Sequence, residues 1–320
     1  MIDPVAFTIN VGNGAFVKDI YWYGIIIAAG MVLALLIAVK NTKLLGKNPE
    51  MLVDFSIIAI VFAIIGARIH YVIWSWDLYK DGPFWKVFAV WEGGLAIYGG
   101  IIGGFLAALI YSKIKNVSLL GLLDIVAPSL LLGQAIGRWG NFVNQEAYGY
   151  AVYNEKLWHF PITVYIQETG QYHLATFFYE SAWNFIGFII LMVALRKGKR
   201  EGRTFFLYMV LYGIGRVFIE GLRTDSQMFL STDIRVNQVL SAVFIIVGAI
   251  FYIFNRNTKD YRLVVEENEN SEPKKSKPGK IRVRKIENQN INQTSGASDE
   301  YKAMTEEMRK QRENSLKNKE

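Results

Sequence analysis

Residues 20–39 read IYWYGIIIAAGMVLALLIAV, an uncharged run long enough to cross a lipid bilayer as one helix. The hydrocarbon core of a bilayer is about 30 Å thick, and a helix needs about 20 apolar residues to span it. Backbone groups in lipid must be satisfied inside helices or closed barrels, and no segment alternates as a barrel strand would. Six further apolar blocks follow along the 320-residue chain, at about 51–74, 93–112, 118–136, 177–195, 204–222 and 236–254. The sequence therefore predicts an all-α polytopic membrane protein with seven transmembrane helices.

Basic residues between these blocks predict the orientation, because short cytoplasmic loops of membrane proteins are enriched in Lys and Arg. They are concentrated after the first, third and fifth blocks, at Lys40, Lys43, Lys47, Lys113, Lys115, Arg196, Lys197, Lys199, Arg200 and Arg203. On the opposite side they are fewer and spread over longer segments. We therefore expect the N-terminus and residues 137–176 to lie outside the cell membrane and the C-terminus to lie in the cytoplasm.

The composition changes after the last block. Residues 1–254 are expected to form the membrane domain, with a small exofacial head at about 145–176. Residues 255–320 mix Glu, Lys, Asn and Ser and bury too little apolar surface to offset chain entropy, so this cytoplasmic tail is expected to be disordered. Its stretch KPGKIRVRK (Lys277–Lys285) could bind anionic membrane lipids. The alternative is a solvated tail with no specific partner.

The sequence restricts what cysteine and histidine can contribute to the chemistry of this protein. The chain has no cysteine, so it makes no disulfide and cannot use its own thiol as a nucleophile or metal ligand. Its three histidines, His70, His159 and His173, lack the spacing of a metal motif. His70 lies at the end of the second block, where an interface role is favoured over that of a catalytic base.

The polar run GRWGNFVNQE, residues 137–146, lies at the outer end of the fourth block. A charge at the bilayer centre costs about 2.5–3.5 kcal/mol on insertion scales, so polar clusters near a span usually bind a ligand or carry out chemistry. The candidates in this run are Arg138, Asn141, Asn144 and Glu146.

The sixth block carries a second polar group. Tyr212, Arg216 and Glu220 are spaced by four and therefore share one helical face, with Arg223 close to the same stripe. Two guanidiniums near the outer leaflet suit a phosphate, because Arg is planar, always charged and able to bind two oxygens together. A phospholipid headgroup is the expected ligand. The alternatives are an Arg216–Glu220 pair that only fixes helix packing, or a bound lipid that only stabilises the structure.

The third block opens WEGGLAIYGGIIGG, Trp91–Gly104, with six glycines. Glycines let helix backbones approach closely, so a packing role is favoured over a chemical one. Tyr98 in their midst needs a hydrogen-bond partner for its hydroxyl. Near the start of the first block, Tyr23 belongs to an interfacial aromatic belt and is the member of that belt to test for function.

Taken together, these residues resemble the bacterial prolipoprotein diacylglyceryl transferases. GRWGNFVNQE fits the signature of that family, and three further pieces match in order: WYG at 22–24, WEGG…YGG, and YGIGRVFIEGLRTDS at 212–226. The resemblance covers residues 20–254. It implies transfer of the diacylglyceryl group of phosphatidylglycerol to the lipobox cysteine of a preprolipoprotein signal peptide, in a bacterial cell membrane. A thioether forms and glycerol phosphate leaves, with no cofactor, no metal and no nucleic-acid partner.

The resemblance also implies roles for individual residues. Arg138 and Arg216 match the essential arginines of the family and are expected to bind the phosphate and stabilise its transition-state charge. Catalytic roles are further expected for Tyr98, Glu146 and Glu220. The substrate-binding candidates, beside Arg138, are Asn141, Asn144, Gly149, Tyr23, Tyr212, Arg223 and Gly99.

Two departures from the family pattern bear on these roles. Many members have a histidine where this chain has Tyr98, and a phenol with its ordinary pKa near 10 is a poor base at neutral pH. Either Tyr98 only shapes the site, or a carboxylate or water in the field of the arginines takes the thiol proton; we favour the second. In HLATFFYE, residues 173–180, Ala175 stands where a proline is common. A transporter and a lipid-binding scaffold are the rival functions, although no inverted repeat supports a transporter.

Overall fold

The computed structural model describes residues 3–11, 16–198, 200–224, 228 and 235–255. The chain divides into two units, Met1–Glu272 and Pro273–Glu320, and all the described residues belong to the first. Apart from Asn255, the tail expected at 255–320 lies outside the described residues.

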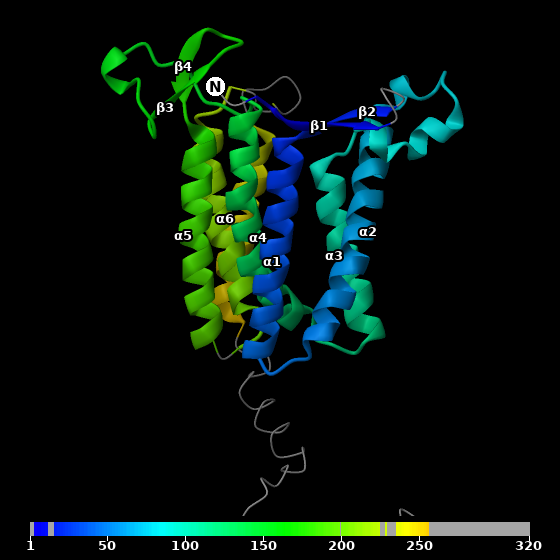
Figure 1. Cartoon of the computed structure of the whole chain (residues 1–320). Coiled ribbons are helices and arrows are strands. Elements are labelled where there is room, and N and C mark those ends of the chain that lie inside the picture. The colour runs from blue at the N-terminus through cyan, green and yellow to red at the C-terminus, as the bar shows by residue number, and fades with distance from the viewer. Residues whose placement is uncertain (1–2, 12–15, 199, 225–227, 229–234, 256–320) are drawn as a thin grey trace, which may run out of the picture. The chain divides into compact units, whose positions relative to one another are not determined.

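The described part of the chain is mostly helical (Figure 1). Its α-helices are α1 (Trp22–Leu44), α2 (Pro49–Trp74), α3 (Ile97–Ile114), α4 (Leu119–Val143), α5 (Thr176–Lys197), α6 (Arg203–Glu220) and α7 (Val236–Phe254). Four short 3-10 helices lie in the connections: η1 (Trp76–Leu78), η2 (Phe84–Phe88), η3 (Val90–Glu92) and η4 (Glu155–Leu157). The predicted helical membrane architecture is confirmed at this level.

Six of these helices, all except α6, are long and apolar enough to cross a membrane. α6 has 18 residues, as many as α3, but it carries Arg203, Arg216 and Glu220. Charges of this kind are tolerated only where they face protein or pair with one another. The described residues therefore bear out six of the seven predicted spans by length and composition, and α6 as a helix.

Side-chain capping contacts explain two helix starts. Asn48 caps α2, since its side chain accepts a hydrogen bond from the Glu50 amide at 2.9 Å, and Pro49 occupies the first turn. Asp124, on the neighbouring helix α4, caps the start of α6. Its buried carboxylate accepts hydrogen bonds from the amides of Gly202 at 2.6 Å and Phe205 at 2.7 Å. The negative charge also suits the positive end of the helix dipole.

The prediction of an all-α fold is wrong in one respect, because two antiparallel hairpins occur. β1 (Val5–Val11) pairs with β2 (Phe16–Tyr21), and β3 (Thr163–Ile166) pairs with β4 (Gln171–Leu174). Such short strands leave no long apolar block, which was the signal used for the spans. Both hairpins lie at the same end of the helices, and β3–β4 falls inside the segment expected to form a head (Figure 1).

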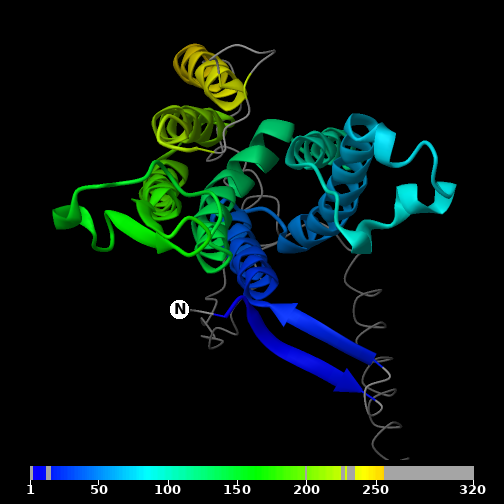
Figure 2. The same cartoon turned by 90° about the horizontal axis from the view of Figure 1, so that it is seen from above.

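Viewed along the helices, α4 lies between α1 and the group formed by α5, α6 and α7, whereas α2 and α3 form a pair (Figure 2). Each helix packs on its partner: α2 on α3, α1 on α4, α4 on α5 and α6 on α7. The α2–α3 contact is close because glycines meet there. A Cβ atom added to Gly99 would lie 2.2 Å from the carbonyl oxygen of Gly66. This confirms the packing role favoured for glycines of the third block.

Candidate active site

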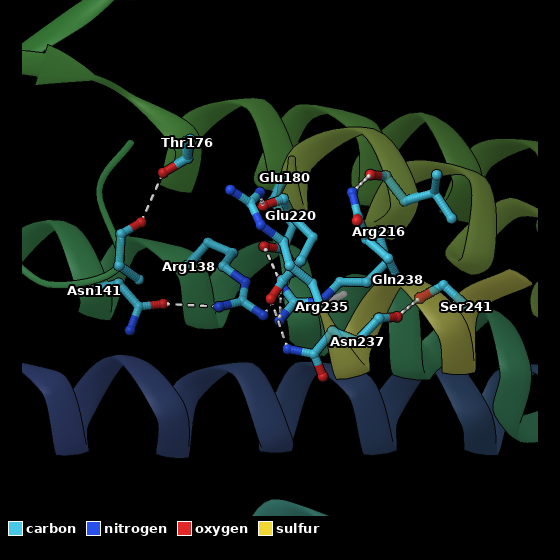
Figure 3. A network of polar contacts seen from close by, with 12 residues as sticks. Arg138, Asn141, Thr176, Glu180, Arg216, Glu220, Arg235, Asn237, Gln238 and Ser241 are labelled. Carbon is cyan, nitrogen blue, oxygen red and sulfur yellow. Dashed lines mark hydrogen bonds and ion pairs between the residues drawn. The ribbon is translucent and has the colours of Figure 1, made fainter. Parts of the chain in front are cut away.

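A single buried carboxylate joins the two arginines that the sequence singled out. Glu180 of α5 lies 2.7 Å from Arg138 of α4 and 3.1 Å from Arg216 of α6, measured between charged oxygen and nitrogen atoms. The three side chains converge from three helices (Figure 3). The predicted convergence of Arg138 and Arg216 is therefore found, with an acidic side chain between them.

A second carboxylate completes the cluster from the same helix as Arg216. Glu220 lies 3.0 Å from Arg216 one turn earlier, the spacing of four that the sequence predicts. Asn237, in the first turn of α7, donates a hydrogen bond to the Glu220 carboxylate at 2.8 Å. Arg235, just before α7, donates to the backbone carbonyl of Glu220. These contacts fix the C-terminal end of α6 against α7.

The cluster is balanced in formal charge and increasingly exposed towards Arg138. The side chains of Glu220 and Glu180 are 1% and 6% exposed, whereas those of Arg216 and Arg138 are 13% and 23% exposed. Ionised groups this deeply buried persist only when they are paired. Arg138 is thus the member of the cluster most accessible to a ligand. In the described part of the chain, no group of His, Asp or Glu side chains is arranged to hold a metal ion.

A second set of polar contacts leads from Arg138 to the end of α4. Arg138 donates to the side-chain oxygen of Asn141 at 3.2 Å, and the Asn141 amide donates to Glu146 at 2.8 Å. Asn144 donates to the same carboxylate at 3.5 Å, a long contact. The predicted cluster at 137–146 is therefore a connected network, and Glu146 holds Arg138 through Asn141.

The backbone explains how Glu146 reaches back over the helix end. α4 ends at Val143, and Gln145 and Ala147 have positive φ angles of 53° and 56°. Residues other than glycine adopt this left-handed conformation infrequently, and such residues are common in turns. The turn directs the Glu146 amide to the carbonyl of Asn141 at 3.0 Å.

Three tyrosines predicted for the site are placed differently from one another. Tyr98 of α3 donates its hydroxyl to Asn237, which joins it to the Glu220 contacts. Tyr212 shares the Arg216 face of α6, and its ring stacks on Tyr208 at 5.8 Å between centroids. Tyr23 packs on Gly140, where an added Cβ would lie 2.8 Å from its ring.

Tyr23 also borders an open pocket. This pocket of about 570 Å³ lies between β2, the start of α1 and the end of α4, and Asn144 contributes to its lining. Asn144, which follows α4 and contacts Glu146, therefore lies at the edge of a surface depression lined largely by apolar side chains.

Three other candidates lie in packing positions. Gly149 is buried, and an added Cβ would lie 2.8 Å from both the Leu174 side chain and the Leu222 carbonyl oxygen. It pairs with Arg223 in an isolated β-bridge that ties the segment after α4 to the end of α6. Gly99 lies at the close α2–α3 contact. These contacts give Gly149, Gly99 and the Arg223 backbone structural roles.

The sequence reasoning missed Glu180, Arg235 and Asn237. A signal for Glu180 was present, because it is a charged residue inside the apolar block at 177–195, and such residues usually pair. Arg235 and Asn237 flank the start of the last block and have no comparable signal. Their importance comes from the packing of α7 on α6.

Comparison with known proteins agrees with this geometry. A family profile described as "Prolipoprotein diacylglyceryl transferase" matches residues 6–254. A phosphatidylglycerol–prolipoprotein diacylglyceryl transferase of Oceanobacillus iheyensis is 47% identical over 250 residues, which cover 76% of this chain and 87% of that protein. Proteins of the same name from Bacillus velezensis and Listeria monocytogenes are 44% and 45% identical over 260 and 259 residues, covering 80% of this chain and 93% and 90% of theirs. The chain belongs to the prolipoprotein diacylglyceryl transferase family.

Proposed function

We propose that this protein transfers the diacylglyceryl group of phosphatidylglycerol to the cysteine thiol of a prolipoprotein, the activity named for its relatives. One observation carries the proposal: the guanidiniums of Arg138 and Arg216 both contact the Glu180 carboxylate, at 2.7 Å and 3.1 Å. Because Arg138 and Arg216 contact the Glu180 carboxylate from two different helices, they can also contact a phosphate bound beside it. Family membership supports assigning this phosphate to the lipid donor.

The reaction is a displacement at the glycerol carbon that bears the phosphate. The thiolate sulfur forms a bond to this carbon while the carbon–oxygen bond to the phosphate breaks. The phosphate oxygen keeps the bonding electrons, so negative charge grows on the leaving glycerol phosphate. Guanidiniums fixed in a site of low exposure stabilise this charge without having to reorganise. Holding both substrates there also replaces a random encounter with an oriented one.

The remaining residues are assigned by their contacts. Glu180 and Glu220 orient Arg216, and Glu146 orients Arg138 through Asn141. Asn144 and Tyr23 border the open pocket and are proposed to contact the lipid headgroup. Tyr212, Tyr98 and the Arg223 side chain are proposed to shape the same site. Gly149 and Gly99 support it through packing.

The membrane arrangement is part of the proposal. We assign α6 as a seventh span whose charges face the other helices, with both hairpins and the head at about 145–176 outside the cell. The basic loops that follow α1, α3 and α5 then face the cytoplasm, as the positive-inside rule requires. Residues 1–254 form the catalytic domain and residues 255–320 the cytoplasmic tail. The acceptor is a signal peptide whose cysteine belongs to a lipobox.

The test is direct detection of product. The purified chain is incubated with phosphatidylglycerol and a lipobox peptide, and mass spectrometry is used to search for a diacylglyceryl thioether on the peptide cysteine. We expect the adduct from wild type and its loss with Arg138→Ala or Arg216→Ala. Arg203→Ala is the matched control, because this exposed arginine lies at the opposite end of α6 over the Tyr252 ring. Absence of product from folded, lipid-binding protein would favour a scaffold or transporter instead.

A further inference from the structure

His70 of α2 has a buried ring nitrogen with no assigned role. Its Nδ1 atom is buried and, among the described residues, has no hydrogen-bond partner. The ring stacks on Trp74 at 6.2 Å and lies against Tyr98 of α3 at 6.4 Å, both measured between ring centroids. A buried polar atom without a partner is costly, so this one requires an explanation.

The other two histidines are placed differently. His173 lies within 2.8 Å of a partner at each ring nitrogen, the Gly149 carbonyl oxygen at Nδ1 and the Thr169 hydroxyl at Nε2. His159 is exposed on the head segment. His70 is therefore the histidine whose buried nitrogen remains available for a proton.

A series of side-chain contacts connects His70 to the arginine cluster. Tyr98, whose ring lies against His70, donates its hydroxyl to Asn237. Asn237 donates to Glu220 at 2.8 Å, and Glu220 pairs with Arg216 at 3.0 Å. The imidazole thus lies at one end of a continuous set of contacts that runs through α3 and α7 to α6.

The transfer reaction needs a proton acceptor. A free cysteine thiol has a pKa of about 8.5, so only a few per cent of it is thiolate at pH 7. Glu180 and Glu220 already pair with the arginines and orient them, so we assign neither carboxylate as the acceptor. Imidazole is the side chain that ordinarily exchanges a proton between pH 5 and pH 8.

We propose that His70, in place of the carboxylate or water favoured from the sequence alone, accepts the proton of the incoming cysteine thiol; this inference rests on the proposed function. The S–H proton moves to Nδ1 of His70, and the thiolate sulfur then forms the bond to the glycerol carbon as glycerol phosphate leaves. The imidazolium afterwards gives its proton to water. Tyr98 fixes the ring orientation beside the arginine cluster and remains protonated.

The groups around His70 are compatible with this role. Arg68, on the same helix, directs its guanidinium to the carbonyl oxygens of Lys86, Val87, Gly93 and Gly94 at 2.6–3.1 Å. Tyr71 is the other titratable neighbour on α2. The elements that pack on α2 are α1, α3 and η2. At the end of the helices where His70 lies, they carry three titratable side chains: Tyr23 of α1, Tyr98 of α3 and Lys86 of η2.

The test is the pH profile of the full-length His70→Gln variant with phosphatidylglycerol and a lipobox peptide. We expect its rate at pH 7 to fall at least about 100-fold, the usual contribution of general base catalysis. Between pH 7 and pH 9 its rate should rise by about 25-fold, because the peptide thiol then ionises by itself. Wild type should respond much less, and His159→Gln should behave as wild type. His70→Ala should regain activity when imidazole is added.

The outcomes separate this inference from the proposed function. A His70→Gln variant with the wild-type rate and pH profile would overturn it. Equal loss at pH 7 and pH 9, with no rescue of His70→Ala by imidazole, would assign His70 a structural role and overturn it as well. If wild type makes no thioether, the proposed function fails, and this inference fails with it.

Discussion

Replacing Glu180 by glutamine removes the negative charge that Arg138 and Arg216 share, at nearly constant side-chain volume. The two ion pairs have separations of 2.7 Å and 3.1 Å, and the Glu180 side chain is only 6% exposed. Removing one partner of a buried ion pair typically costs about 3–5 kcal/mol, because the other charge stays buried without compensation. Glutamine keeps one acceptor oxygen, and Arg138 is partly exposed, so we expect about 3 kcal/mol of lost stability.

Denaturant titration in detergent, followed by tryptophan fluorescence, measures this loss. Glu168→Gln is the matched control, because Glu168 is exposed between β3 and β4; its change should stay within about 0.5 kcal/mol. Glu201→Gln tests whether stability and activity separate. Glu201 is buried at the other end of the helices, 3.4 Å from Lys47. This variant should lose stability but keep its transfer rate per folded molecule.

The transfer rate of Glu180→Gln should fall by about 100-fold, because small displacements of groups that contact the reacting atoms have effects of this size. The measurement is thioether formation with saturating lipid and peptide. A Glu180→Gln enzyme as stable as wild type would refute the energetic reasoning. One that transfers at the wild-type rate would refute the claim that Glu180 positions the arginines.

Three further predictions concern single contacts. Arg138→Lys keeps the charge but loses the planar pair of donors, so the rate of thioether formation should fall about 10–100-fold while lipid binding weakens less; an unchanged rate would remove Arg138 from the phosphate site. Tyr98→Phe removes the hydroxyl that contacts Asn237 but no proton acceptor, so substantial activity should remain, and a complete loss with an intact fold would contradict this. Gly99→Ala would bring its Cβ to 2.2 Å from the Gly66 carbonyl oxygen, and should cost about 1–3 kcal/mol or more in the same titration. Gly104→Ala, with nothing within 4 Å of the added Cβ, should be nearly neutral, and equal losses would refute the packing argument.

Much of the architecture follows from local pattern. The apolar blocks correspond to six helices that can cross a membrane and to α6, because block length and helix rise relate directly to bilayer thickness. The Arg216–Glu220 pair was predictable for a similar reason, since a spacing of four places two side chains on one helical face. The hairpins β1–β2 and β3–β4 escaped prediction because short strands leave little periodic signal.

The sequence by itself determined that this is a helical membrane protein with arginines and acidic residues inside its apolar blocks. It also identified the segment 137–146 as a polar cluster. Only the tertiary structure decided that Glu180 lies between Arg138 and Arg216, that Asn237 joins Tyr98 to Glu220, and that His70 lies against Tyr98. The physical reason is that periodicity fixes the face of a residue on its own helix. Which faces meet depends on how the helices rotate and approach one another, and side-chain packing across the whole bundle sets that arrangement.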